Sequence, residues 1–341
     1  MDLCETIKSI LIKKAQEDST DRTSWPALCI GLLQEEATNL EDTSLHLNQS
    51  IQSLIVSPTS QKSRFDKGVL ERPFYLALVE MLSLCFENSG EFPRSLKTSK
   101  VFMLENTNLP RAPIMFLVTF KPIKSRLNEI EQEMKHLIGS WNGIPLVFEE
   151  FHRNSLNDFL FKFLTPRDLN TFLGLRTTLG SAIQLPPSLP ECLAAFTQRY
   201  VKKNTKLVRA SISNILTVGA KAFSKHCHRD TSGSFWGVCS GTEERKNEQA
   251  NKVLAKILTN AAWINLHSLP HNTRVFEVRN LDGYGARWEI REPQCQQLQS
   301  QLQTDSSSTT NSFNSSDGTN IMFRGFLEPQ MKDGHDKGWI H

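Results

Sequence analysis

The sequence predicts an α+β fold, in which a helical N-terminal half precedes helices packed on a four-stranded, mainly antiparallel sheet. Three observations support this fold class. Apolar residues recur at helical spacing through most of the first hundred residues. Four segments after residue 260 alternate apolar and polar residues, which is typical of strands with one buried face. Hydrophobic residues make up 39% and charged residues 22%, a composition that excludes a disordered chain.

Three helices are predicted in the first hundred residues. The first begins near Leu3 and repeats its apolar residues at three- and four-residue intervals. The second runs through residues 26–40 and the third through 74–88, with Asn-Ser-Gly turn residues at its end. Residues 57–68 are polar, so we expect an exposed loop there.

The middle of the chain predicts a small mixed α/β element. An apolar run at 114–120 is rich in strand formers, a helical pattern follows at 125–141, and 144–150 has the pattern of a second strand. Two further helices are expected at 154–163 and 166–176.

The C-terminal third of the chain has the most regular patterns of apolar and polar residues. One helix is expected at 206–226, and a second at 243–259 because Ser240 and Glu243 have capping-box spacing. The four expected strands span 263–270, 273–280, 286–292 and 321–329.

These patterns divide the chain into three regions. We expect a helical region at 1–110, a mixed α/β region at 111–190 and a ligand-binding α+β module at 191–341. The proline-rich residues 185–190 mark the second boundary. Residues 294–320 are almost entirely Gln, Ser, Thr and Asn, which predicts a disordered insertion within the module.

The sequence favours a cytoplasmic or nuclear protein without a membrane partner. No apolar run reaches the roughly 18 residues that cross a bilayer. The first residues include Asp2 and Glu5, where a secretion signal would be basic. Seven scattered cysteines are too few for a disulfide scaffold, so we expect reduced thiols.

Positive charge is concentrated in one stretch of the chain. Residues 192–229 contain eight lysines and arginines and no carboxylate, which favours an anionic partner. The alternative is an ordinary solvated helix face.

Strand alternation collects polar residues on one face of the predicted sheet. In the fourth strand it places Phe323 and Leu327 on the apolar face. The polar face holds Asn265, His267, Glu277, Arg279, Arg287, Arg324 and Glu328. A solvated face with cross-strand ion pairs is the simpler interpretation. Arginine, however, offers planar, two-pronged hydrogen bonding that suits phosphate, so we favour a functional face.

A phosphate-bearing ligand, either a nucleotide or RNA, fits these residue types. The expected ligand-binding residues are Lys225, His226, His228, Arg229, Trp236, Arg279, Tyr284, Arg287 and Arg324. Trp236 and Tyr284 would stack on bases, whereas Trp288 belongs by the same parity to the apolar face. The alternative to phosphate binding is that the cationic residues at the C-terminal end of the 206–226 helix only compensate the helix dipole.

His267 and Glu277 are the expected catalytic pair, because an imidazole beside a carboxylate can move protons. We expect no metal at the site. The zinc alternative would use His226, Cys227, His228, Cys239, His335 and His341, but their spacing matches no zinc motif. Nucleophilic catalysis by Cys227 or Cys239 is a further alternative, although neither lies in a recognised signature.

The sequence therefore predicts a phosphate-ligand or RNA-binding protein, with phosphate-transfer or hydrolytic chemistry as an extension. It identifies no cofactor. The alternative is a non-enzymatic scaffold that engages a protein partner through its N-terminal helices and an ordered C-terminal tail.

Overall fold

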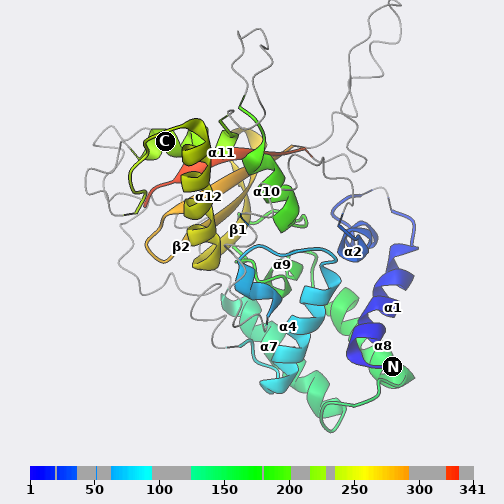
Figure 1. Cartoon of the computed structure of the whole chain (residues 1–341). Helices are drawn as coiled ribbons and strands as arrows, with labels where there is room; N and C mark the ends of the chain where they lie inside the picture. The colour runs from blue at the N-terminus through cyan, green and yellow to red at the C-terminus, as the bar shows by residue number, and fades with distance from the viewer. Residues whose placement is uncertain are drawn as a thin grey trace, which may run out of the picture.

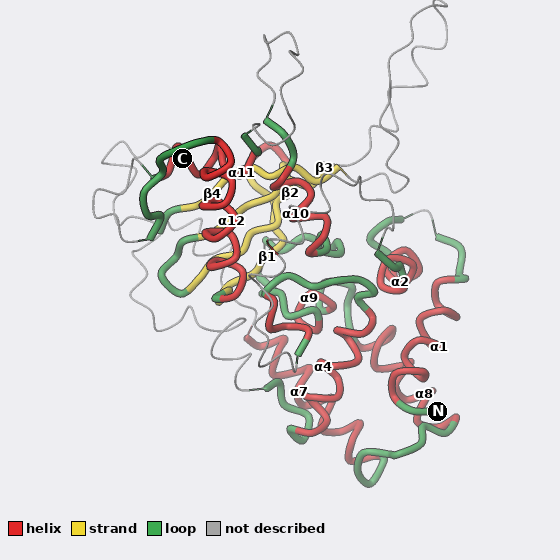
Figure 2. The backbone as a smooth tube through the Cα atoms, in the orientation of Figure 1, coloured by secondary structure: helices red, strands yellow, loops and turns green. Residues whose placement is uncertain are grey.

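Four antiparallel strands and the helices around them form an α+β fold, as the sequence predicts (Figures 1 and 2). The strands lie in the order β1-β2-β3-β4, so each pairs with its neighbour in the sequence. The computed structural model describes residues 1–19, 21–36, 51, 63–93, 124–178, 180–200, 216–227, 235–291 and 320–329. The expected loop residues 57–62, the strand at 114–120, the 294–319 part of the insertion and the C-terminal tail from 330 lie outside the described residues.

The three expected N-terminal helices are present, although the second ends at Leu33, before the expected residue 40. They are α1 (Leu3–Ala15), α2 (Trp25–Leu33) and α4 (Tyr75–Glu87). The start of α1 is fixed by an N-cap: the Asp2 carboxylate accepts a hydrogen bond from the backbone N–H of Glu5 at 2.8 Å. Helix α7 (Lys124–Ser140) also follows the prediction.

Three predictions for the middle region, one strand and two helices, are wrong or only partly right. Residues 144–149 form a loop and not a strand, because the N–H of Phe148 donates to the carbonyl of Met1 instead of to a neighbouring strand. The helix expected at 154–163 is α8 (Glu150–Asp158) followed by a π-helical turn, Phe159–Phe163. The helix expected at 166–176 shrinks to α9 (Leu169–Phe172), since Gly174 adopts φ +69° and ends it.

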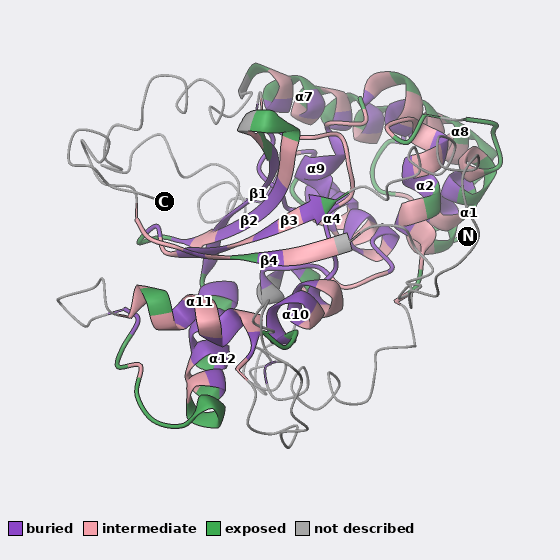
Figure 3. Ribbon diagram, turned by 90° about the horizontal axis from the view of Figure 1, so that it is seen from above, coloured by how far each residue is buried: buried purple, intermediate pink, exposed green. Residues whose placement is uncertain are grey.

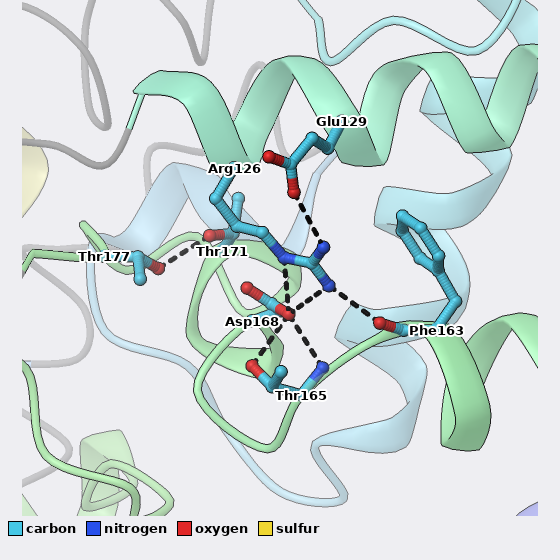
Figure 4. A network of polar contacts seen from close by, with 7 residues as sticks. All are labelled: Arg126, Glu129, Phe163, Thr165, Asp168, Thr171 and Thr177. Carbon is cyan, nitrogen blue, oxygen red and sulfur yellow. Dashed lines mark hydrogen bonds and ion pairs between the residues drawn. The ribbon is translucent and has the colours of Figure 1, made fainter.

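A partly buried ion pair fastens α7 to the turn before α9 (Figure 4). The Nε and Nη2 atoms of Arg126 donate to Oδ2 of Asp168 at 3.2 and 3.0 Å, and Nη2 also reaches the carbonyl of Phe163. The same Asp168 oxygen accepts from the N–H and hydroxyl of Thr165. These bonds keep the turn closed and hold α9 against the helical region.

All four expected strands are present. They are β1 (Ala261–Leu269), β2 (Thr273–Asn280), β3 (Gly285–Arg291) and β4 (Asn320–Leu327). The β1–β2 connection bends through His271 and Asn272, both with positive φ. The β2–β3 turn uses Gly283 at φ +89°, a conformation that favours glycine.

Three helices cover one face of the sheet: α10 (Leu189–Thr197), α11 (Val218–His226) and α12 (Glu243–Thr259) (Figure 3). Trp288 is fully buried beneath them and donates its indole N–H to the carbonyl of Cys192 at 2.9 Å. The Phe196 ring of α10 meets Phe323 of β4 edge-on at 4.8 Å. This face is the core of the C-terminal module.

Two helix starts differ from expectation. Residues 206–215 lie outside the described residues, and α11 is capped by the Thr217 hydroxyl, which accepts from the N–H of Ala220. Helix α12 is capped by Thr242 and not by Ser240, because the Thr242 hydroxyl accepts from the N–H of Arg245.

A β-bulge in β4 changes the expected alternation. Arg287 pairs with Gly325 but Trp288 pairs with Phe323, so Arg324 is an extra residue. The expected placement of Leu327 on the apolar face is therefore wrong. Phe326 lies there instead and packs on Phe196 and Phe323.

Residues 176–182 extend the hydrogen bonding beyond β1. The N–H groups of Arg176 and Ala182 donate to the carbonyls of Ile264 and Leu266, both at 2.8 Å. Ser181 forms a β-bridge with His267. The Thr177 hydroxyl also hydrogen-bonds that of Thr171 in α9 at 2.6 Å (Figure 4). This segment therefore joins the helical region to the sheet.

Replacing Gly219 by alanine is expected to destabilise the protein by ~1–3 kcal/mol through overpacking. A Cβ there would overlap the Phe196 ring, and the clash outweighs the better helix propensity of alanine. Gly139→Ala in α7 is the matched control, because its Cβ meets no atom within 4 Å. It should stabilise by ~0.5–1 kcal/mol. Urea denaturation measures both, and equal shifts would rule out tight packing at Gly219.

No helix in the described part of the chain is long and apolar enough to span a membrane.

Candidate functional site

A buried carboxylate organises the polar face of the sheet. Glu277 in β2 is 1% exposed and faces Arg287 of β3 in the strand register. Its two oxygens accept hydrogen bonds from Nε of Arg279 at 2.6 Å and from Nε of Arg287 at 2.7 Å. His267 of β1, also 1% exposed, places Nε2 at 3.4 Å from Oε2 of Glu277. One carboxylate thus fixes two guanidinium groups.

Glu277 is ionised at neutral pH. Burial alone raises its pKa, but the charges of Arg279 and Arg287, with help from His267, hold the pKa well below the ordinary 4.5. An ionised carboxylate only accepts hydrogen bonds, so Glu277 orients the arginines and has no proton to donate.

An open pocket of about 300 Å³ lies against β4 and the end of α11. Four cationic side chains line it, with a single carboxylate. The lining residues are Ala222, Lys225, His226, Arg279, Arg287, Arg324, Gly325, Phe326, Leu327 and Glu328. The excess of positive charge suits an anion of more than one negative charge.

The cations are held to different degrees. Arg279 is the most constrained, since its Nη1 also donates to the carbonyls of Gly283 and Glu328 at 2.6 and 3.0 Å. Arg324 is 44% exposed and donates to Glu289 at 2.8 Å. Lys225 is exposed at the last turn of α11. The pocket therefore combines one tightly hydrogen-bonded wall with two outer, more exposed cations.

Gly325 leaves room at the pocket. It lies at the β-bulge with φ +143°, and a Cβ built there meets nothing within 4 Å. Any larger residue would be strained at this φ and would project a side chain into open space beside the arginines.

A histidine–glutamate pair closes the other side of the pocket. Nδ1 of His226 lies 2.9 Å from Oε1 of Glu328, and both side chains are largely buried. The imidazole packs against Trp236 at 5.1 Å and Phe326 at 6.3 Å between ring centroids. A carboxylate on Nδ1 fixes the orientation of the ring and its tautomer.

The structure gathers five of the expected ligand-binding residues in one pocket: Lys225, His226, Arg279, Arg287 and Arg324. The expected catalytic pair, His267 and Glu277, does come together, but neither residue lines this pocket. His228 and Arg229 lie outside the described residues.

The two expected stacking residues lie in an aromatic cluster. Trp236 is 3% exposed. Tyr284 stacks on Phe235 with centroids 3.8 Å apart and planes 2° apart. Lys256 lies over the other ring of this stack, 4.2 Å from the Phe235 centroid. In the described structure these rings support the loop beside His226.

Sequence reasoning missed the roles of Gly325 and Glu328. Gly325 carries a local signal, because a glycine inside a strand pattern often marks a bulge. Strand parity places Glu328 on the arginine face, whereas its carboxylate pairs with His226 of α11. The bulge accounts for this difference, because it shifts the alternation by one residue.

The described residues contain no group of three or more histidine, cysteine or acidic side chains able to hold a metal ion. Of the zinc ligands considered, His228, His335 and His341 lie outside the described residues. Cys227 and Cys239 do lie close together, since both thiols hydrogen-bond to Ser224.

Residues 206–293 match the profile of a family described as the CdiA C-terminal tRNase toxin domain. The match spans about a quarter of the chain and includes Lys225, His226, Arg279 and Arg287, while Arg324 and Glu328 follow it. Comparison with curated proteins and with solved structures found no match.

Proposed function

We propose that the chain is an RNA-binding ribonuclease whose active site is the pocket between β4 and the end of α11. One observation carries the proposal: four cations and a His–Glu pair line a pocket whose core residues lie in the segment similar to tRNase toxin domains. The proposal joins the expected phosphate binding to the expected hydrolytic chemistry.

The arginines would bind the phosphodiester. Glu277 occupies the Nε atoms of Arg279 and Arg287, which orients the outer edge of each guanidinium. Guanidinium edges fit phosphate oxygens in pairs, and fixed donors stabilise the extra charge of a five-coordinate phosphorus without reorganising. Lys225 and Arg324 would neutralise the neighbouring phosphate charge.

His226 would move the proton. Its imidazole would take the proton of the RNA 2′-hydroxyl as the 2′-oxygen attacks phosphorus and the bond from phosphorus to the 5′-oxygen breaks. The leaving 5′-oxygen takes a proton from water, and the products are a 2′,3′-cyclic phosphate and a 5′-hydroxyl end. Glu328 holds the ring and stabilises its charged form.

Arg287→Lys is expected to weaken RNA binding by about 10-fold, because lysine loses the two-pronged contact with phosphate. Arg291→Lys is the matched control: it lies on the same strand, is 51% exposed and does not line the pocket. Fluorescence anisotropy with a labelled single-stranded RNA measures both, at two salt concentrations because phosphate contacts weaken with salt. Equal losses in the two variants would indicate unspecific charge attraction.

The scaffold alternative is favoured by a separate observation. The loop before α8 exposes Leu146 by 95% and Val147 by 60%, and the first turn of α8 exposes Phe151 by 59%. Exposed apolar side chains in a cluster are typical of protein contact sites. If the wild-type protein binds no RNA in the anisotropy experiment, this interpretation replaces the ribonuclease.

A further inference from the structure

Two cysteine thiols meet beside the pocket. Cys227 ends α11, and Cys239 lies in the segment that leads into α12. Both thiols bind the same residue, Ser224: Cys227 Sγ donates to its carbonyl at 3.5 Å, and Cys239 Sγ donates to its hydroxyl at 3.4 Å. These two hydrogen bonds to one serine hold the two sulfur atoms close together.

These two cysteines differ from three of the others that the structure describes, while Cys4 in α1 is partly exposed as they are. Cys29, Cys85 and Cys192 are fully buried, whereas Cys227 and Cys239 are only partly buried. Partial burial leaves a path for a small reagent, which a buried thiol lacks. Burial and the neighbouring Cys239 raise the pKa of Cys227 to about 11, so Cys227 is a thiol at neutral pH.

The pair is coupled to the pocket through its sequence neighbours. His226 immediately precedes Cys227. Trp236, three residues before Cys239, packs on the His226 ring and on Phe326. The two thiols therefore lie next in the sequence to the segments that position the His226 ring.

We propose that Cys227 and Cys239 form an oxidation site that is converted to a disulfide by a low-molecular-weight disulfide. One cysteine thiolate attacks the small disulfide, forms a mixed disulfide and releases one small thiol. The thiolate of the other cysteine then attacks the mixed disulfide, which forms the protein disulfide and releases the second small thiol. The protein loses two electrons and two protons, and the small disulfide gains them.

The same disulfide would regulate the pocket, and this part of the inference rests on the proposed ribonuclease function. Sulfur atoms in a disulfide are about 2.05 Å apart, much closer than in a hydrogen bond. Forming the bond would draw the end of α11 and the Trp236 segment together. His226 would then leave its position against Glu328.

Glutathione disulfide added to the purified full-length protein tests the site. We expect an intact mass lower by about 2 Da, the loss of two hydrogen atoms, and a Cys227–Cys239 peptide in a non-reducing digest. Cys239→Ser should instead retain a glutathione adduct on Cys227. Cys4→Ser, which removes a partly exposed cysteine in α1, should behave as wild type. A stable adduct on the wild-type pair, or no reaction, would overturn the proposal.

RNA cleavage by reduced and oxidised protein tests the regulation. We expect oxidation to slow cleavage by about 10-fold or more, because a displacement near 1 Å can cost on the order of 100-fold. Dithiothreitol should restore the rate, and Cys239→Ser should be insensitive to the cycle. A disulfide that leaves the rate unchanged refutes the regulation. Reduced protein that cleaves no RNA refutes the ribonuclease, while the mass result still decides the oxidation site.

Discussion

Replacing His226 by alanine is expected to slow RNA cleavage by about 10²- to 10⁴-fold, the usual contribution of a general base. RNA binding should change little, because the cations that line the pocket remain. The loss of rate is expected because His226 is the histidine among the described residues that line the pocket. Its Nδ1 lies 2.9 Å from Oε1 of Glu328, which holds the ring in place. Single-turnover cleavage of a labelled RNA measures the rate, and anisotropy measures the binding.

The control for this variant is His136→Ala. His136 is an exposed histidine on α7, away from the pocket lining, so its removal should leave cleavage unchanged. Glu328→Gln should give a smaller loss than His226→Ala, because glutamine can still accept a hydrogen bond but does not stabilise the charged ring. Full activity in His226→Ala would show that another group takes the proton.

Replacing Glu277 by leucine is expected to destabilise the protein by ~3–5 kcal/mol, the usual cost of removing one partner from a buried ion pair. The side chains of Arg279 and Arg287 are only 12% and 17% exposed, so both would lose their acceptor away from water. Guanidinium chloride denaturation measures the change. RNA binding should fall as well, because the two guanidinium groups lose their common anchor.

Glu289→Leu is the matched control on the neighbouring strand. Its carboxylate also pairs with two arginines, but these are 51% and 44% exposed. Exposed ion pairs contribute little, so we expect a loss of ~1 kcal/mol or less. Similar losses for the two variants would mean that burial does not distinguish Glu277.

The pKa of Glu277 adds a pH dependence to the same comparison. The carboxylate has a lower pKa in the folded protein than the ordinary 4.5. Its stabilisation is therefore fully present above that value and is lost as the pH falls through the folded pKa. Glu277→Gln cannot titrate, so its stability deficit relative to wild type should narrow below about pH 4.5. A deficit that stays constant in acid would contradict this.

Local patterns predicted most of the architecture. The four strands and helices α1, α4 and α7 follow from the spacing of apolar residues and from turn residues at their ends. The loop at 144–149 has the composition of a strand but finds no partner strand in the described structure. Pairing is a property of the whole chain, which is why composition misled there.

The site was predictable in one part only. Strand parity places Arg279 and Arg287 on one face, and the structure brings them together. The pairing of His226 with Glu328 joins residues 102 positions apart. It depends on how α11 packs through Gly219 against Phe196, and on the bulge at Gly325. Neither feature has a local signature that fixes the partner.

The hydrogen bonds between residues 176–182 and β1 bear on how the chain opens. Separating β1 from this segment breaks the backbone bonds of Arg176 and Ala182 and exposes Asn265, whose side chain contacts Ser181. Amide protons on both sides should therefore exchange with solvent in one concerted event. A fragment that starts near residue 190 would carry β1 as a bare strand edge, the kind of surface that recruits other chains into aggregates.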